Sequence, residues 1–220
     1  MGRAASFVLL VAFAACGGGA ASPTPASTGT APPNATVSAS GPWTFTVDSS
    51  SKATVRVREV LAQIRAPGDA VLAASGVKGT VTLNADGSFA PTSKITLDLS
   101  ALRSDSNQRD GYVKDNVLEI RRFPTAELVP TKATGLALPL PLSGDIAFTL
   151  AGKMTVHGVT KDVTFAVKAS RDGTKLTATA TADPAWKFGD FGMTIPRVAS
   201  VLSIEDDIRI EVALVANESG

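Results

Sequence analysis

The sequence predicts an all-β fold, an eight-stranded antiparallel β-barrel in which one helix between strands covers a barrel end. First, apolar residues recur at every second position in segment after segment between residues 42 and 217, as in strands with one buried face. Second, short turn motifs separate these segments, among them residues 84–87 and 171–174. Third, the spacing becomes helical only once, after Ser104. The interior of such a barrel holds either side chains or one ligand.

Residues 1–15 are predicted to be an export signal peptide. Arg3 precedes an apolar run over residues 7–15, which is shorter than the roughly 20 residues that span a bilayer. The following residues, 13–16, resemble a bacterial lipobox, in which the cysteine becomes the lipid-modified first residue of the mature protein. We therefore expect acylation of Cys16 and an exported lipoprotein anchored to a membrane on the extracytoplasmic side, in the periplasm or at the cell surface. The alternatives for this thiol are a free cysteine and an intermolecular disulfide.

Residues 16–41 are predicted to form a disordered tether, lipidated at its first residue. They consist almost wholly of Gly, Ala, Ser, Thr and Pro and lack charged residues, so they bury too little apolar surface to offset the entropy of ordering. The folded domain is expected over residues 42–217. The whole chain has 21 basic and 20 acidic residues, and this balance argues against nucleic acid or anionic lipid headgroups as the main partner.

The first two strands are predicted over residues 42–47 and 53–64. Glu59 lies in the apolar phase of the second strand, where an unpaired buried charge would be costly. Two interpretations are open, an ion pair with an arginine at the barrel mouth and a contact with a ligand. A turn is expected at residues 66–69. The next strand carries Gly79 in its inward phase, where a glycine lets another group approach closely, and a further strand covers residues 93–99.

The one substantial helix is predicted from Ser106 to about Glu119. Asp105 or Ser106 caps it, Val113 and Val117 follow helical spacing, and a proline at position 124 closes it. Strands then return at residues 125–131.

Residues 152–165 predict a β-hairpin, with His157 and Gly158 at its turn. Two more strands follow at residues 176–182 and 204–216. Between them, residues 186–196 interleave bulky apolar side chains with Gly189 and Gly192. This segment is interpreted as a lid that plugs the barrel end with aromatic residues, or as a mobile rim that contacts an entering apolar ligand.

Few residues in the chain are suited to catalysis. His157 is the only histidine and Cys16 the only cysteine, which excludes a Cys/His zinc cluster. No serine lies in a Gly-x-Ser-x-Gly motif, and no glycine-rich phosphate loop precedes a helix. On a hairpin turn, His157 is expected to bond to the backbone rather than act as a general base. An enzyme acting on a lipid or ester would rest on His157 and Glu59 alone, so we expect no enzyme, no metal and no catalytic residue.

Three stretches carry a recognisable pattern: SDSNQRDGYVKDNVLEIRRFPTAE at residues 104–127, GKMTVHGVTKDVTF at 152–165 and FGDFGMTIP at 188–196. Together with the Glu-Asp-x-Ile at the last strand, they resemble the YceI-like family of exported, lipocalin-like polyisoprenoid-binding proteins. The resemblance spans nearly all of the domain at 42–217, in order. It implies a lipocalin-like barrel whose apolar tunnel takes an isoprenoid chain, including that of an isoprenoid quinone, and it implies no catalytic residue.

Carried onto this sequence, the resemblance places the inward strand residues on the tunnel wall. The predicted ligand-binding residues are Val57, Leu61, Val81, Leu83, Ile95, Leu97, Phe148, Leu150, Met154, Phe165, Ile208 and Ile210, with Phe188, Phe191 and Met193 at the rim. The expected function is that of a membrane-tethered carrier or reservoir for a polyisoprenoid or other long-chain lipid. The alternative is an extracytoplasmic protein-interaction module whose barrel is filled by side chains.

Overall fold

The computed structural model of the protein describes residues 41–219, which form ten strands. The strands are β1 (Trp43–Val47), β2 (Lys52–Leu61), β3 (Pro67–Ser75), β4 (Lys78–Leu83), β5 (Lys94–Asp98), β6 (Thr125–Thr134), β7 (Ser143–Val156), β8 (Val159–Asp172), β9 (Lys175–Ala182) and β10 (Val201–Ser219). The helical segments are η1 (Leu99–Ala101), α1 (Asn107–Tyr112), the π-helical turn η2 (Val113–Val117) and η3 (Phe188–Phe191).

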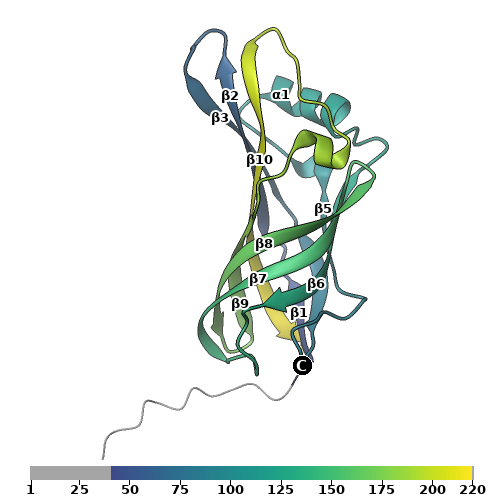
Figure 1. Ribbon diagram of the computed structural model, residues 1–220, viewed down its shortest axis with the longest axis vertical. Helices are drawn as coiled ribbons and strands as arrows, with labels where there is room; N and C mark the ends of the chain where they lie inside the picture. Colours follow the sequence, from purple (N-terminus) through teal and green to yellow (C-terminus); the bar gives the residue numbers. More distant parts are fainter. Residues whose placement is uncertain (1–40, 220) are drawn as a thin grey trace, which may run out of the picture. The chain divides into compact units, whose positions relative to one another are not determined.

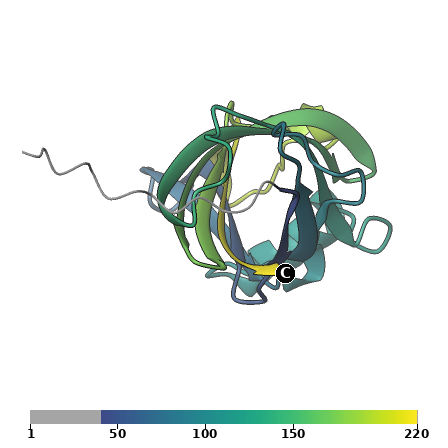
Figure 2. The same ribbon diagram turned by 90° about the horizontal axis from the view of Figure 1, so that it is seen from below.

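Eight of these strands close into a ring. Their order is β1-β4-β5-β6-β7-β8-β9-β10, all neighbouring pairs are antiparallel, and β10 pairs back to β1. Seen from below, the ring surrounds the barrel interior (Figure 2). The predicted eight-stranded antiparallel barrel, with its helix between strands, is confirmed.

The hairpin of β2 and β3 lies outside this ring. β10 pairs with β1 near its C-terminal end and with β2 over residues 201–213, so the hairpin extends the wall beyond the end of β1 (Figure 1). The expected turn at residues 66–69 is wrong, because β3 begins at Pro67. Proline and glycine at this point are typical of turns, but proline is also tolerated as the first residue of a strand.

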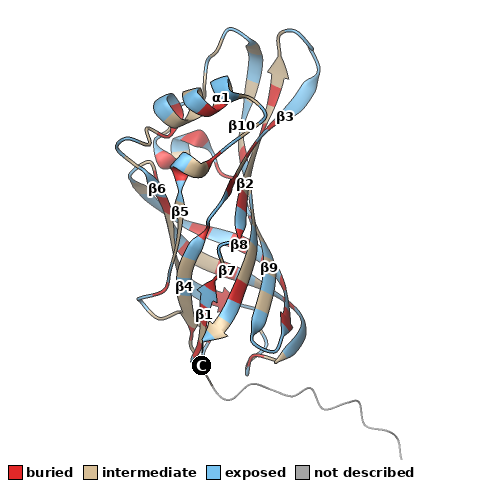
Figure 3. Cartoon of the chain, turned by 180° about the vertical axis from the view of Figure 1, so that it is seen from behind, coloured by how far each residue is buried: buried red, intermediate tan, exposed pale blue. Residues whose placement is uncertain are grey.

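Buried and exposed residues alternate along the strands (Figure 3), and the buried side chains form two main clusters inside the barrel. At the lower end in Figure 1, near β1, Trp43, Phe45 and Leu83 pack with Ile146. The larger cluster lies toward α1 and η3. The lower end is therefore filled by the protein's own side chains.

The local predictions for Gly79 and the helix agree with the structure. A Cβ at Gly79 would lie 2.0 Å from the carbonyl oxygen of Lys94, so β4 approaches β5 closely at this glycine. The helix begins as predicted, with the Ser106 hydroxyl accepting a hydrogen bond from the backbone N–H of Arg109 at 3.3 Å. It continues through the π-helical turn to Val117. The β7–β8 hairpin turns at His157 and Gly158, which both have positive φ, 52° and 74°, as a type I′ turn requires.

Candidate functional site

The upper part of the barrel encloses a cavity of about 370 Å³. This volume is within the range of about 300–1,000 Å³ that is typical of ligand pockets. The walls come from β2, β3, β5, β6, β7, β8, β9 and β10, with α1 and η2 on one side and the segment around η3 on another. Almost all lining side chains are aliphatic or aromatic. The alternation along each strand explains this, because one parity of residues faces the interior.

Most of the predicted ligand-binding residues line this cavity. These residues are Val57, Leu61, Ile95, Leu97, Leu150, Met154, Phe165, Phe188, Phe191, Met193, Ile208 and Ile210. Val81, Leu83 and Phe148 do not line it. They point inward as expected, but they pack in or against the cluster of Trp43 and Phe45 that fills the lower end. A ligand contact for the residues that line the cavity stays a prediction.

The lid around η3 forms part of the cavity wall. Phe188 and Phe191 are buried, and the Trp186 ring contacts Phe165 edge-on at 5.9 Å and Phe191 at 5.0 Å between centroids. This packing agrees with a lid whose aromatic side chains close the barrel. The same side chains face the cavity, so anything bound there would contact them.

Polar contacts hold the lid from outside. Asp190 accepts hydrogen bonds from the Lys161 ammonium at 2.7 Å and from the backbone N–H of Lys187 at 2.8 Å. The hydrogen bond from Lys161 has the larger effect and the one from Lys187 the smaller, and both keep the pKa of Asp190 below its ordinary value. The Asp206 carboxylate accepts from the backbone N–H of Phe188 at 2.9 Å, and Lys187 pairs with Asp207. The lid is thereby fixed to both β8 and β10.

His157 connects three segments: the β7–β8 turn, the residues after the helix and the lid around η3. Its Nδ1 donates to the carbonyl oxygen of Phe191 at 3.2 Å, and its Nε2 lies 3.3 Å from Glu119 Oε1. Its ring stacks edge-on against Phe123, with centroids 4.9 Å apart. Hydrogen bonds from Arg122, which has the larger effect, and from His157 lower the pKa of the Glu119 carboxyl. The prediction that His157 is a turn residue bonded to the backbone is confirmed.

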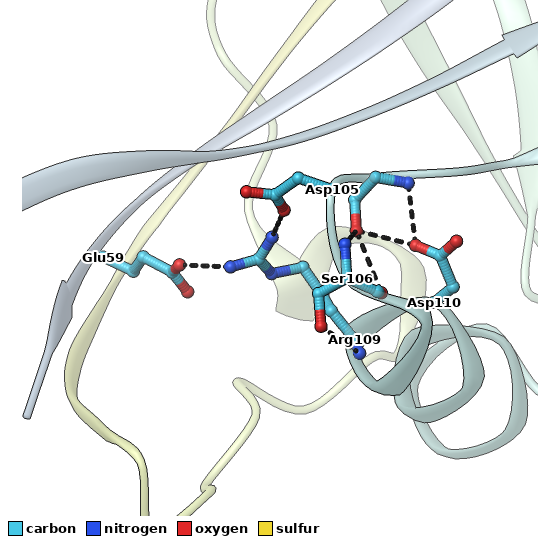
Figure 4. Close-up of polar contacts among 6 residues, drawn as sticks. Glu59, Asp105, Ser106, Arg109 and Asp110 are labelled. Carbon is cyan, nitrogen blue, oxygen red and sulfur yellow. Dashed lines mark hydrogen bonds and ion pairs between the residues drawn. The ribbon is translucent and has the colours of Figure 1, made fainter.

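Glu59 is the one carboxylate on the cavity wall among the described residues. Its Oε1 lies 2.8 Å from Nη2 of Arg109, and Nη1 of Arg109 binds Asp105 (Figure 4). The side chains of Glu59 and Arg109 are 9% and 21% exposed. The ion-pair interpretation of Glu59 is confirmed, although its partner comes from the helix. Asp105 is thus a partner of Arg109, and the cap is Ser106.

Asp110 holds the loop before the helix. It accepts hydrogen bonds from the backbone N–H of Ser104 at 2.8 Å and from its hydroxyl at 2.7 Å (Figure 4). Burial alone would raise the pKa of Asp110, but the two hydrogen bonds from Ser104, together with the charges of Lys114 and Arg103, outweigh burial and lower the pKa. The contact fixes the start of α1 beside the cavity.

Sequence reasoning did not assign the lining residues from the helix, from β3 and from the segment before β10. Tyr112, Val113 and Val117 come from the helical segment, and Leu72 comes from β3. Ala70, Leu72 and Ala74 alternate with less buried residues, and this pattern indicates the buried face of β3. The turn expected at residues 66–69 hid the start of this strand. The lining residues of segment 196–201 have no periodicity that would reveal them.

A YceI-like domain model matches residues 36–216 of the chain. The chain belongs to the YceI-like domain family. The YceI-like match covers all lining residues of the cavity and the whole ring except the last three residues of β10. The family match agrees with the prediction of a binding protein rather than an enzyme.

Several proteins are similar to this YceI-like chain. A UPF0312 protein of Pseudomonas putida is 29% identical over 126 residues, which are 54% of this chain and 62% of that protein. A polyisoprenoid binding domain from Saccharophagus degradans has a similar structure, with a TM-score of 0.60 at 15% identity, over 80% of this chain and 98% of that one. The structure of BcnA from Burkholderia cenocepacia is similar as well. Its TM-score is 0.58 at 20% identity, over 78% of this chain and 99% of that one. At such low identity, the two structures establish the shared fold.

Cys16, the signal peptide and nearly all of the tether lie outside the described residues. Within residues 41–219, no group of His, Cys, Asp and Glu side chains is arranged to hold a metal ion. The same part of the chain has no helix that is long and apolar enough to cross a membrane.

Proposed function

We propose that the protein binds a long-chain apolar lipid, in particular an isoprenoid, in the barrel cavity. The observation that carries this proposal is the cavity of about 370 Å³ with its nearly continuous apolar lining. Each methylene group that leaves water for such a lining contributes about 0.8 kcal/mol. A chain of several isoprene units therefore binds firmly without specific polar contacts, and a polyprenyl quinone is among the ligands of this class.

The family supports this ligand class, since a structurally similar domain is a polyisoprenoid binding domain. The cavity itself argues against the alternative of a protein-interaction module, because that alternative needs an interior filled by side chains. Only the lower end of the barrel is filled in this way.

Acylation of Cys16 is the second part of the proposal. Combined with a tether over residues 16–41, it makes the protein a carrier or reservoir held at a membrane on the extracytoplasmic side. More than one acyl chain is needed for firm anchoring. The mass of the mature N-terminal peptide tests this part independently of the cavity.

The test of lipid binding is mass spectrometry of an organic extract of the full-chain protein, purified from cells in its processed form. We expect a long-chain lipid, enriched over a mock purification that lacks the protein. Protein stripped of lipid is expected to take up an added polyprenol or polyprenyl quinone. Absence of long-chain lipid from the native preparation, together with failure of this uptake, would refute the proposal.

A further inference from the structure

Two loops form a protruding end of the molecule, which we name the tip. The tip consists of residues 62–66, between β2 and β3, and residues 197–203, which include the first three residues of β10. The backbone N–H of Ala62 donates to the carbonyl oxygen of Ser200 at 2.9 Å, and Leu61 pairs with Val201. Figure 1 shows these loops at the top, at the opposite end of the barrel from β1 and the C-terminus. The two loops therefore form one surface.

The tip exposes large apolar side chains to solvent. Among the described residues, the large hydrophobic side chains that are exposed are Ile64 (66%), Leu202 (61%) and Val71 (38%). The two most exposed both lie on the tip. Scattered single apolar residues need no explanation, but here the two most exposed ones lie on joined loops at one protruding end.

The charge of the tip has one sign. Arg65 and Arg197 are both exposed, and no carboxylate occurs in residues 60–68 or 191–204. Acidic residues flank the tip on both sides: Asp69, after the first loop, is paired with Arg58 and Arg209, and Glu205, two residues after the second segment, is exposed. Apolar side chains flanked by arginines match the interface of a bilayer with anionic headgroups, where the side chains enter and the guanidinium groups stay at the phosphates.

The tip also borders the opening of the cavity. Leu61, Val198 and Val201 line the cavity from the tip side. The lining includes Gln108 and Ser200, which are exposed, so the cavity reaches the surface between the start of α1 and the tip. A lipid leaving a bilayer at the tip would meet this opening directly.

We propose that the tip is a membrane-docking surface, in which Ile64 and Leu202 enter a lipid bilayer and Arg65 and Arg197 bind its anionic headgroups. This inference rests on the proposed lipid-binding function and adds the route of the lipid. Docking brings the cavity opening to the bilayer, so that an apolar chain passes between them with little exposure to water. It also selects anionic membranes over neutral ones.

The experiment uses the full-chain protein with Leu202→Trp and vesicles whose phosphatidylcholine carries brominated acyl chains. Bromine quenches tryptophan on contact, and the native tryptophans, Trp43 and Trp186, are buried at 3% and 9% exposure. Trp186 lines the cavity, so its quenching by an entering chain is a background that every variant shares. We expect Trp at position 202 to be quenched, more strongly when phosphatidylglycerol is included. Adding Arg65→Gln and Arg197→Gln should weaken that quenching at least about twofold, since each arginine near an anionic surface changes binding by about fivefold.

The matched control is Val71→Trp, which puts the same probe on an exposed position of β3, away from the tip. Because quenching reports which surface touches lipid, the result does not depend on any anchor at the N-terminus. Quenching at position 202 that does not exceed quenching at position 71 would overturn the proposal. Lipid in the cavity is measured separately by extraction, so failure of docking and failure of lipid binding are distinguished.

Discussion

Glu59 places a carboxylate in the wall of an otherwise apolar cavity, and its ion pair explains how that charge is tolerated. Arg109 reaches from α1 to Glu59 on β2 and also binds Asp105. Buried ion pairs add little stability compared with well-packed apolar groups, but removing one partner leaves the other charge uncompensated. We infer that the pair fixes where the helix sits on the barrel end.

Replacement of Arg109 by methionine is therefore expected to destabilise the fold by about 2–3 kcal/mol, because Glu59 then lacks its cation. The free energy of unfolding in urea measures this. The double variant Glu59→Gln/Arg109→Met should recover most of the loss.

Lys153→Met is the matched control, since its partner Asp162 is 84% exposed. An exposed pair contributes less than about 1 kcal/mol. A cost for Arg109→Met no greater than that of Lys153→Met would show that the Glu59 pair does not hold the helix.

At the scale of elements, the lid η3 combines an aromatic inner face with ionic contacts on its outer face. Its cavity side is made by Phe188 and Phe191, while Asp190 connects it to Lys161 on β8. His157 adds a bond to the carbonyl oxygen of Phe191. The outer contacts therefore determine how readily the inner wall of the cavity opens.

Acid is expected to loosen this lid. The pKa of Asp190 is lowered from 3.8 by its bonds with Lys161 and Lys187. A lowered pKa in the folded state means that the stabilisation is complete above pH 3.8 and is lost as the pH falls through the lowered value. As the pH falls below 3.8, hydrogen exchange of the backbone amides in η3 should accelerate relative to exchange of the amides paired between β7 and β8. Asp190→Asn should make η3 exchange fast already at neutral pH and reduce this pH dependence to the part that comes from Asp206 and Asp207. An unchanged dependence would contradict the assignment.

Local patterns in the sequence predicted most elements, and the misses have physical reasons. Helical spacing and the serine cap located the helix, and alternation located the ring strands. β3 was missed because Pro67 and Gly68 are equally at home in a turn and at the start of an edge strand. The Arg109 partner of Glu59 was not predicted, because no local rule brings residues so far apart in sequence into contact.

At the scale of the whole molecule, the barrel is filled at one end and hollow at the other. Alternation shows which side chains point inward, but it contains no information about their height along the barrel axis. Phe148 and Leu150 share one phase of β7, yet only Leu150 lines the cavity. The difference arises because Trp43 and Phe45 fill the lower end, which is a property of the assembled ring.

The hollow end leads to a prediction about ligand capacity. Ala180 on β9 lines the cavity, whereas its neighbour Thr179 is exposed. Ala180→Phe should place a ring in the lipid space, and we expect the lipid recovered per protein to fall sharply while the fold persists, because the cavity accommodates the ring.

A bound ligand at a hundredfold excess over its Kd stabilises a fold by about 2.7 kcal/mol. The difference in unfolding free energy between lipid-loaded and stripped protein should thus disappear in Ala180→Phe and remain in Thr179→Phe. Equal lipid content in the two variants would place the binding site outside the cavity.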